Sequence, residues 1–175
     1  MRSVSRLVAA VAMALSLGLL VAADQWTKSL AATHLAGRGP VRLLGDFAVL
    51  IFASNRGAFL SLGSALPRPL RSLFLIILPA AALLFILWAF LTPGQGLRSG
   101  RRLGLRDRAV LVLIAAGGIG NLTDRILYGQ VRDFLNFGIG TLRTGIMNLA
   151  DLYILAALVV AVVAIASGWW RGRGA

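Results

Sequence analysis

The sequence contains no cysteine, no glutamate and only one histidine, His34. Without cysteine, these 175 residues cannot form a disulfide framework, bind a metal through thiolates or supply a cysteine nucleophile. A single histidine also excludes a zinc site built on two or three histidines. The remaining acid–base groups are few, so the six aspartates are the leading candidates for catalysis if the chain is an enzyme.

Charged residues are scarce as well. They make up 14 % of the chain, whereas soluble domains contain about 25 %. Apolar residues make up 58 %, and the net charge is +12, from 17 arginines, one lysine and six aspartates. The basic residues cluster between long apolar runs, a pattern that membrane topology explains better than nucleic-acid binding. We therefore expect one membrane domain without a nucleic-acid partner.

Four apolar runs have about the length needed to cross a bilayer. They predict spans at approximately residues 7–23, 72–91, 109–126 and 150–168, with 24–71 and 127–149 as extracytoplasmic segments. The first run could be a signal peptide, but three more follow it, so we expect a retained anchor. Pro79 lies inside the second run and predicts a kink. The expected fold is an all-α polytopic membrane protein with one domain, residues 1–175.

The arginines indicate the orientation of the spans. Five of them lie in the 93–108 loop, and two lie near each end of the sequence. A four-span chain puts these three regions on one side, which the positive-inside rule makes cytoplasmic. The basic residues of 24–71 do not follow the rule. Five aspartates then fall at or beyond the outer ends of the spans, and we expect any chemistry there: Asp24, Asp46, Asp124, Asp133 and Asp151.

The first outer segment contains a run typical of a β-strand. Residues 46–54, DFAVLIFAS, are rich in β-branched and aromatic side chains, and Gly45 and Gly57 bound the run. This pattern predicts a small sheet on the outer membrane surface.

Residues 117–125, GGIGNLTDR, place three polar side chains on one helix face. Asn121, Asp124 and Arg125 are spaced at i, i+3 and i+4, so they lie close together on a helix. The simplest interpretation is that Asp124 pairs with Arg125, while Asn121 joins two helices. A basic partner lowers the pKa of an aspartate, which suits a scaffold better than a shared-proton site. The glycines of this motif would let another helix approach closely.

Asp133 and Asp151 form a second candidate cluster. Taken singly, Asp133 is a loop aspartate, and Asp151 lies near position N3 of a helix capped by Asn148. Taken together, at one membrane boundary and only 18 residues apart, they suggest two carboxylates sharing a proton. The ionised one could take a proton from water while the other donates to a peptide carbonyl. The helix dipole favours charge on Asp151, so we expect Asp133 to hold the proton.

Five motifs in order resemble the lipoprotein signal peptidase family, also called signal peptidase II or prolipoprotein signal peptidase. They are DQWTK at 24–28, NRGA at 55–58, GNLTDR at 120–125, VRDF at 131–134 and NLAD at 148–151. The resemblance implies a four-helix aspartyl endopeptidase of the bacterial inner membrane, with cytoplasmic termini and an extracytoplasmic β-cradle. It implies cleavage of prolipoproteins before a diacylglyceryl-modified cysteine. We expect a monomer in contact with membrane lipid, without cofactor or metal.

The resemblance also implies roles for individual residues. The catalytic pair would be Asp133 and Asp151. Four residues would support this pair: Asn121, Asp124, Arg125 and Asn148. Four others would help to form the substrate pocket: Asp24, Lys28, Asn55 and Gly57.

The sequence departs from the family pattern at three places. Met147 stands where phenylalanine is common, and Phe59 stands where a second alanine is common. The stretch 135–146 lacks the tryptophan and proline often found before the last motif. Both aspartates are retained, so these departures concern substrate fit or subclass rather than the type of reaction.

Three other functions fit parts of the sequence. Boundary aspartates are also typical of a small transporter or proton-coupled membrane protein, which would have an acidic residue midway along a span. A serine–lysine protease would use Lys28 as the base for a serine such as Ser54 or Ser61. In a membrane scaffold without activity, the aspartates would only cap helices and form ion pairs.

Overall fold

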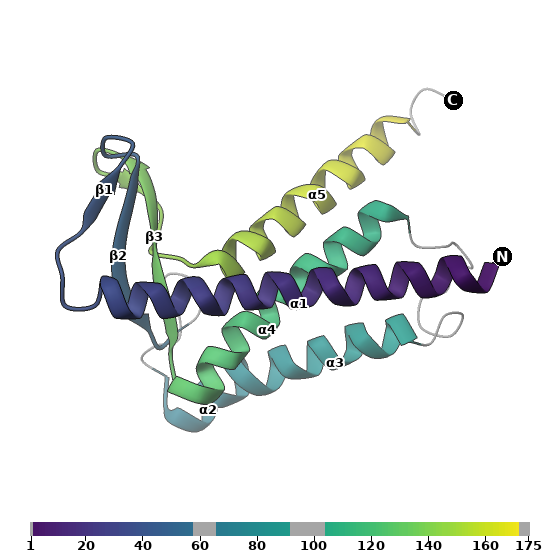
Figure 1. Cartoon of the computed structure of the whole chain (residues 1–175), viewed down its shortest axis with the longest axis horizontal. Coiled ribbons are helices and arrows are strands. Elements are labelled where there is room, and N and C mark those ends of the chain that lie inside the picture. Colours follow the sequence, from purple (N-terminus) through teal and green to yellow (C-terminus); the bar gives the residue numbers. More distant parts are fainter. Residues whose placement is uncertain (1, 58–65, 92–103, 172–175) are drawn as a thin grey trace.

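The computed structural model describes residues 2–57, 66–91 and 104–171, and its long helices extend away from one small sheet (Figure 1). The helical segments are α1 (Arg2–His34), α2 (Arg68–Ser72), the π-helical turn η2 (Leu73–Ile77), α3 (Leu78–Leu91), α4 (Leu105–Tyr128) and α5 (Leu149–Arg171). Within the described residues, four helical stretches are long and apolar enough to cross a membrane, as expected. Helix α1 begins and α5 ends far from the sheet.

Helix α1 does not end near Ala23, where the sequence analysis places the end of the first span. It continues to His34, so Asp24 lies within the helix rather than at its outer end. Lys28 lies one turn further on, and its Nζ is 2.9 Å from a carboxylate oxygen of Asp24, with both side chains fully buried. Because each charge is paired inside the protein, neither has to reach water, and the helix can continue past both.

The second span contains an irregular turn just before Pro79. In η2, the backbone follows a π-helical path, and the N–H of Leu78 donates to the carbonyl of Leu73, five residues earlier. Proline has no N–H, and its ring clashes with the carbonyl four residues before it. Single π-helical turns inside α-helices are rare, and they are one of the recognised causes of a change in helix direction. The irregularity expected at Pro79 thus takes the form of a π-helical turn.

Four strands form one antiparallel sheet in the order β1–β2–β3–β4. They are β1 (Val41–Leu43), β2 (Ala48–Asn55), β3 (Val131–Ile139) and β4 (Leu142–Arg143). Strand β2 confirms the strand expected at 46–54, although Asp46 and Phe47 lie in the turn before it. Strand β3 corrects the prediction of a loop around Asp133. Its pairing with β2 places Asp133 opposite Ala53.

The interior of the described part of the chain is small and polar. Six polar or charged side chains are buried there: Asp24, Lys28, Asn121, Asp124, Asp133 and Asn148. Many large apolar side chains of the helices, such as Leu19, Leu84 and Val163, are exposed instead. This distribution suits helices surrounded by lipid, in which polar groups face the inside of the bundle. Six of the candidate site residues therefore lie in the protein core, whereas Asn55, Arg125 and Asp151 are half-buried.

Two glycines allow α4 to approach its neighbours closely. A Cβ on Gly117 would lie 2.5 Å from the backbone oxygen of Ala150 in α5, and one on Gly120 would lie 2.5 Å from a carboxylate oxygen of Asp24 in α1. Small residues at such positions let helix backbones come together in a membrane. The expected close approach is therefore confirmed: α4 meets the α5 backbone at Gly117 and the Asp24 side chain of α1 at Gly120.

We predict that Gly117→Ala lowers the melting temperature of the detergent-purified protein by several degrees. The new methyl group would push against the α5 backbone, and overpacking of this kind costs about 1–3 kcal/mol. Gly118→Ala is the matched control, because its methyl group would meet only the side chain of Leu83, at 3.0 Å or more. Equal melting temperatures for the two variants would contradict the prediction.

Candidate active site

The site is built around the first turn of α5. The N–H of Asp151 donates to Oδ1 of Asn148 at 3.1 Å, and the N–H of Asn148 donates to Oδ2 of Asp151 at 3.2 Å. These two bonds are a reciprocal cap, as expected from Asn148 before the helix and Asp151 at N3. The N–H of Ala150 donates to Oδ1 of Asp24 at 2.9 Å. A carboxylate of α1 thus completes the N-terminus of α5.

Asp133 faces this helix end from strand β3. Its side chain is buried, with 2 % of its surface exposed. The side-chain amide of Asn148 donates to its Oδ1 at 2.6 Å, and that of Asn55 donates to its Oδ2 at 3.0 Å. Asn55 lies two residues beyond Ala53, the strand partner of Asp133, so the sheet itself sets this contact. Two amides therefore fix the orientation of the carboxyl group.

Asn148 and Asn121 join the two aspartates in one network. Asn148 contacts Asp133 through its side-chain nitrogen and Asp151 through its backbone N–H. The side-chain nitrogen of Asn121 donates to Oδ1 of Asp151 at 2.8 Å, and the nitrogen of Asn148 donates to Oδ1 of Asn121 at 3.1 Å. The structure thus brings together the two carboxylates that the sequence analysis pairs.

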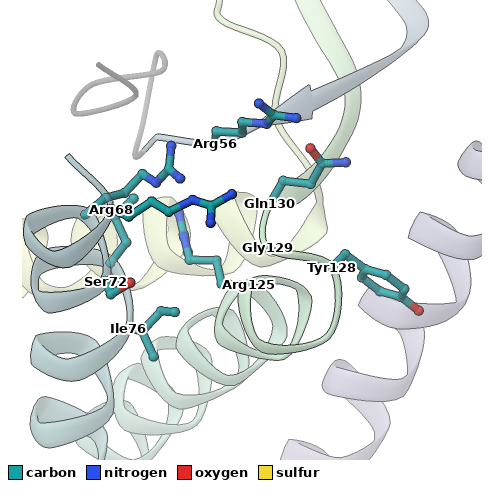
Figure 2. A pocket seen from close by; sticks show the side chains of 10 residues that line it. Arg56, Arg68, Ser72, Ile76, Arg125, Tyr128, Gly129 and Gln130 are labelled. Atoms are coloured by element: carbon teal, nitrogen blue, oxygen red, sulfur yellow. The ribbon is translucent and has the colours of Figure 1, made fainter. Parts of the chain in front are cut away.

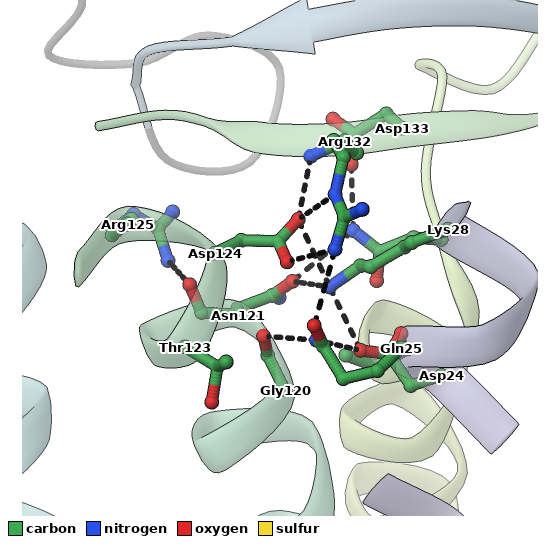
Figure 3. Close-up of polar contacts among 12 residues, drawn as sticks. Asp24, Gln25, Lys28, Gly120, Asn121, Thr123, Asp124, Arg125, Arg132 and Asp133 are labelled. Atoms are coloured by element: carbon green, nitrogen blue, oxygen red, sulfur yellow. Dashed lines mark hydrogen bonds and ion pairs between the residues drawn. The ribbon is translucent and has the colours of Figure 1, made fainter. Parts of the chain in front are cut away.

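Lys28 is the centre of a second set of contacts behind these amides (Figure 3). Its Nζ lies 2.9 Å from Asp24, 3.0 Å from Oδ1 of Asn121 and 3.7 Å from Asp124. The three charged side chains are fully buried. An ammonium group has three hydrogens to donate and no acceptor. Lys28 therefore holds α1 against α4 at the depth of the site.

Asp124 pairs with Arg132, not with Arg125 as its helix spacing suggested. Its carboxylate accepts the backbone N–H of Arg132 at 2.9 Å, and the two side chains are 2.8 Å apart. The guanidinium of Arg132 also lies 4.4 Å from the ring centre of Tyr128, a cation–π contact. Strand β3 starts three residues after α4 ends, so it brings Arg132 back over Asp124. Asp124 anchors the strand that carries Asp133.

Arg125 points toward a different part of the protein. Its guanidinium donates to the backbone oxygens of Gly57 at 3.0 Å and Asn121 at 3.4 Å. The N–H of Gly57 in turn donates to Oδ1 of Asn55 at 2.9 Å. Arg125 therefore holds the end of β2, from which Asn55 reaches Asp133. This contact supports the site through the backbone rather than through an ion pair.

The residues expected to form a substrate pocket lie in two different environments. Asn55 and Gly57 lie at the end of β2, beside Asp133. Asp24 and Lys28 are fully enclosed between α1, α4 and α5. In this structure, Asp24 and Lys28 therefore act on the site through hydrogen bonds and do not line an open surface.

The other two aspartates lie outside this network. Asp46 is half exposed and forms ion pairs with Arg42 and Arg143 on the sheet. Asp107 accepts the N–H of Gly104 at 2.8 Å and caps the start of α4. Within the described residues, no group of three or more histidine, cysteine, aspartate or glutamate side chains is arranged to hold a metal ion.

The pKa of Asp133 is raised to about 6, mainly by burial, and the nearby charge of Asp151 acts in the same direction. The amide hydrogen bonds from Asn55 and Asn148 act in the opposite direction, because they stabilise the ionised form. Asp133 therefore binds a proton more tightly than an ordinary aspartate. That Asp133 rather than Asp151 holds the shared proton stays a prediction.

Two residues of the site escaped the sequence analysis. Arg132 and Gln25 stand next to Asp133 and Asp24 in the motifs, but the sequence assigns no role to either. In the structure, the side-chain oxygen of Gln25 accepts a hydrogen bond from Arg132 at 3.1 Å, while its nitrogen donates to the carbonyl of Gly120 at 3.0 Å. The signal that could have pointed to Arg132 and Gln25 was their position next to Asp133 and Asp24 in the sequence.

We predict that Asp124→Asn lowers the melting temperature strongly. It leaves Arg132 without its carboxylate partner and removes one of the two carboxylates near Lys28, and breaking a buried pair costs about 3–5 kcal/mol. Arg42→Gln is the control, since the Arg42–Asp46 pair is exposed to solvent and such pairs contribute about 1 kcal/mol or less. Thermal unfolding in detergent measures both variants, and a similar small loss in each would contradict the role given to Asp124.

Comparison with known proteins connects this site to a family. The family model described as signal peptidase (SPase) II matches residues 16–167. The lipoprotein signal peptidase of Borrelia duttonii (strain Ly) is 34 % identical over 153 residues, which cover 84 % of this chain and 85 % of the relative. The lipoprotein signal peptidase of Treponema pallidum (strain Nichols) is 34 % identical over 152 residues, which cover 83 % of this chain and 78 % of the relative.

The fold comparison agrees with the sequence comparison. A solved structure, described as a bacterial membrane enzyme determined by the in meso method at 2.3 Å resolution, has a TM-score of 0.73 and 24 % identity. The match covers 89 % of this chain and 88 % of the other, and shows that the two share a fold. With the family model spanning most of the sequence, and five motifs joined in one buried network, this protein belongs to the signal peptidase II family.

Proposed function

We propose that the protein removes the signal peptide from bacterial prolipoproteins by cutting the bond before a diacylglyceryl-modified cysteine. Membership of the signal peptidase II family makes it a peptidase, and the relatives described above are named lipoprotein signal peptidases. The observation that carries the proposal for the site is the contact of Asn148 with both Asp133 and Asp151. Two carboxyl groups held in this way can share a proton and activate water.

In the proposed reaction, Asp151 is the base and Asp133 is the acid. Water loses a proton to the Asp151 carboxylate as its oxygen attacks the scissile carbonyl carbon, and Asp133 protonates the carbonyl oxygen. In the second step, Asp151 passes its proton to the amide nitrogen, the carbon–nitrogen bond breaks, and Asp133 recovers a proton from the intermediate. Both carboxyl groups return to their initial states, so no other reactant is needed.

The contacts of each carboxylate support this division of roles. Asp151 accepts hydrogen bonds from Asn121 and from the N–H of Asn148, and it lies in the first turn of α5, where the helix dipole stabilises negative charge. The raised pKa of Asp133 favours its protonated form. Asn55 would orient Asp133, while Lys28 would orient Asn121.

We further propose that the sheet and the site face the outside of the bacterial inner membrane, with both termini in the cytoplasm. Helix α3 ends and α4 begins on the side away from the sheet (Figure 1), and residues 93–108 of the sequence contain five arginines, which supports this orientation. The exposed apolar surface of the helices would face lipid. A substrate with two acyl chains could then keep them in the membrane while its peptide reaches Asp133 and Asp151. Binding energy from the acyl chains would then position the scissile peptide bond.

The structure does not favour a serine–lysine protease. The Nζ of Lys28 is fully buried among Asp24, Asn121 and Asp124, which suits a charged ammonium rather than a neutral base. Ser54 lies on the sheet and accepts a hydrogen bond from Gln130. Ser61 lies outside the described residues. None of the matches above is to a transporter or to an inactive scaffold.

We predict that Asp133→Asn and Asp151→Asn each reduce cleavage of a diacylglyceryl-modified prolipoprotein by at least about a thousandfold, since each removes one partner in proton transfer. Asp46→Asn is the control, because this aspartate is half exposed on the sheet. A gel-shift assay measures cleavage, and thermal unfolding confirms that each variant is folded. Appreciable cleavage by either site variant would overturn the assignment.

The pH dependence gives an independent test of the acid. Because the pKa of Asp133 is raised to about 6, its protonated form is present below this pH and is lost as the pH rises through it. The initial rate of cleavage should therefore decline as the pH rises through about 6. Asn55→Ala removes a bond that favours the ionised form, so the decline should move to higher pH.

The matched control for this pH test is Ser54→Ala. Ser54 lies on the same strand as Asn55 but contacts Gln130 instead of Asp133, so the pH profile should stay in place. Initial rates measured over a pH series decide the outcome. A shift of the Asn55→Ala profile to lower pH would show that Asp133 is not the acid.

A further inference from the structure

A cavity of about 380 Å³ lies beside the proposed active site, where the second span meets α4. Its lining includes four arginines, Arg56, Arg68, Arg71 and Arg125, and no acidic residue. Figure 2 shows Arg56, Arg68 and Arg125 reaching toward the same space from the end of β2, from α2 and from α4. Neither Asp133 nor Asp151 lines the cavity, so it is a separate feature of the molecule.

Three of the four arginines around this cavity have no acidic partner in the described part of the chain, whereas Arg125 lies near the aspartates of the site. Among the residues that the structure describes, Arg56, Arg68 and Arg71 form no ion pair, whereas Arg42, Arg132 and Arg143 each pair with an aspartate. Like charges gathered around one space repel one another, unless an anion lies between them. The cavity therefore has the charge of an anion site.

Arg125 adds a second observation to the charge. Its guanidinium donates to two backbone oxygens, but its Nε is buried without a hydrogen-bond partner in the described part of the protein. A buried donor of this kind needs a partner, because leaving it unpaired costs about 1–3 kcal/mol. An anionic ligand in the adjacent cavity could supply an acceptor. Guanidinium groups are well suited to phosphate, which they can contact through two hydrogen bonds at once.

The surroundings of the cavity indicate a lipid as the source of the anion. Arg68 and Arg71 lie at the start of the second candidate span, and Leu75 and Ile76, one turn further along it, also line the cavity. On the same span, Phe74, Ile77 and Leu78 are exposed apolar side chains. A headgroup in the cavity would thus continue into acyl chains lying along a lipid-facing helix. Basic pockets between membrane helices bind anionic headgroups in this way.

We propose that this cavity binds the phosphodiester headgroup of an anionic membrane phospholipid, with Arg68 and Arg71 as its principal contacts. The inference goes beyond the proposed peptidase activity and does not rest on it. It also accounts for basic residues in a segment where the positive-inside rule would not place them. Because Arg125 lines the cavity and holds Gly57 at 3.0 Å, the bound lipid would lie next to the strand end that carries Asn55.

The test is native mass spectrometry of the purified protein with added lipids. The probes are a diacyl phosphoglycerol, a diacyl phosphocholine and an uncharged diacyl glycolipid of the same acyl length. We expect wild-type protein to retain the phosphoglycerol lipid most strongly and the glycolipid least. Arg68→Gln/Arg71→Gln should weaken retention of the phosphoglycerol lipid about tenfold or more, because charge-assisted hydrogen bonds are lost.

The matched control is Arg38→Gln/Arg42→Gln, which removes the same charge from exposed positions outside the cavity. It should retain the phosphoglycerol lipid like the wild type. Equal loss in the two double variants, or equal retention of the three lipids by wild-type protein, would overturn the proposal. So would inorganic phosphate displacing the lipid at similar concentration, since the site would then recognise free phosphate. If the Arg68→Gln/Arg71→Gln variant unfolds, lipid retention by Arg68→Lys still tests the proposal. The order in which wild-type protein retains the three lipids tests it as well.

Discussion

The arrangement of the site depends on one buried positive charge, the ammonium group of Lys28. An isolated ammonium in the protein interior costs several kcal/mol, so it must be surrounded by acceptors. Its neighbours are two carboxylates and one amide oxygen, from Asp24, Asn121 and Asp124. Asp24 also caps α5, and Asp124 also holds the start of β3. Through these partners, one cation fixes the relative positions of α1, α4, α5 and the sheet.

The same cation sets the direction of the hydrogen bonds that reach the aspartates. Lys28 can only donate, so Asn121 must present its oxygen to Lys28 and its nitrogen to Asp151. Asn148 likewise donates to Asp133 and to Asn121, because its own oxygen accepts the N–H of Asp151. Each amide thus has one allowed orientation. The two carboxylates receive donors whose positions are decided elsewhere, and this pre-organisation is what a polar catalytic site requires.

Much of this arrangement could be predicted from the sequence, because membrane spans and helix caps are local signals. Long apolar runs predicted the four helices, and the spacing of Asn148 and Asp151 predicted the cap of α5. Apart from the pairing of Asp133 with Asp151, non-local contacts could not be predicted. Strand β3 buries Val131, Asp133 and Phe134, so its pattern does not alternate simply between apolar and polar residues. The partner of Asp124 was missed for the same reason, since helix spacing indicates Arg125, whereas the returning strand supplies Arg132.

The chain order of the network has a consequence for how the protein is made. Asp24 and Lys28 come from the first helix, whereas Asn148 and Asp151 come with the last one. Until α5 enters the membrane, Asp133 lacks its Asn148 contact, and Asp151 is absent altogether. A partly synthesised chain therefore holds its acidic groups without the geometry that pairs them. The potential to hydrolyse peptides would arise only when the final span joins the first, so biosynthesis itself would keep the immature protein inert.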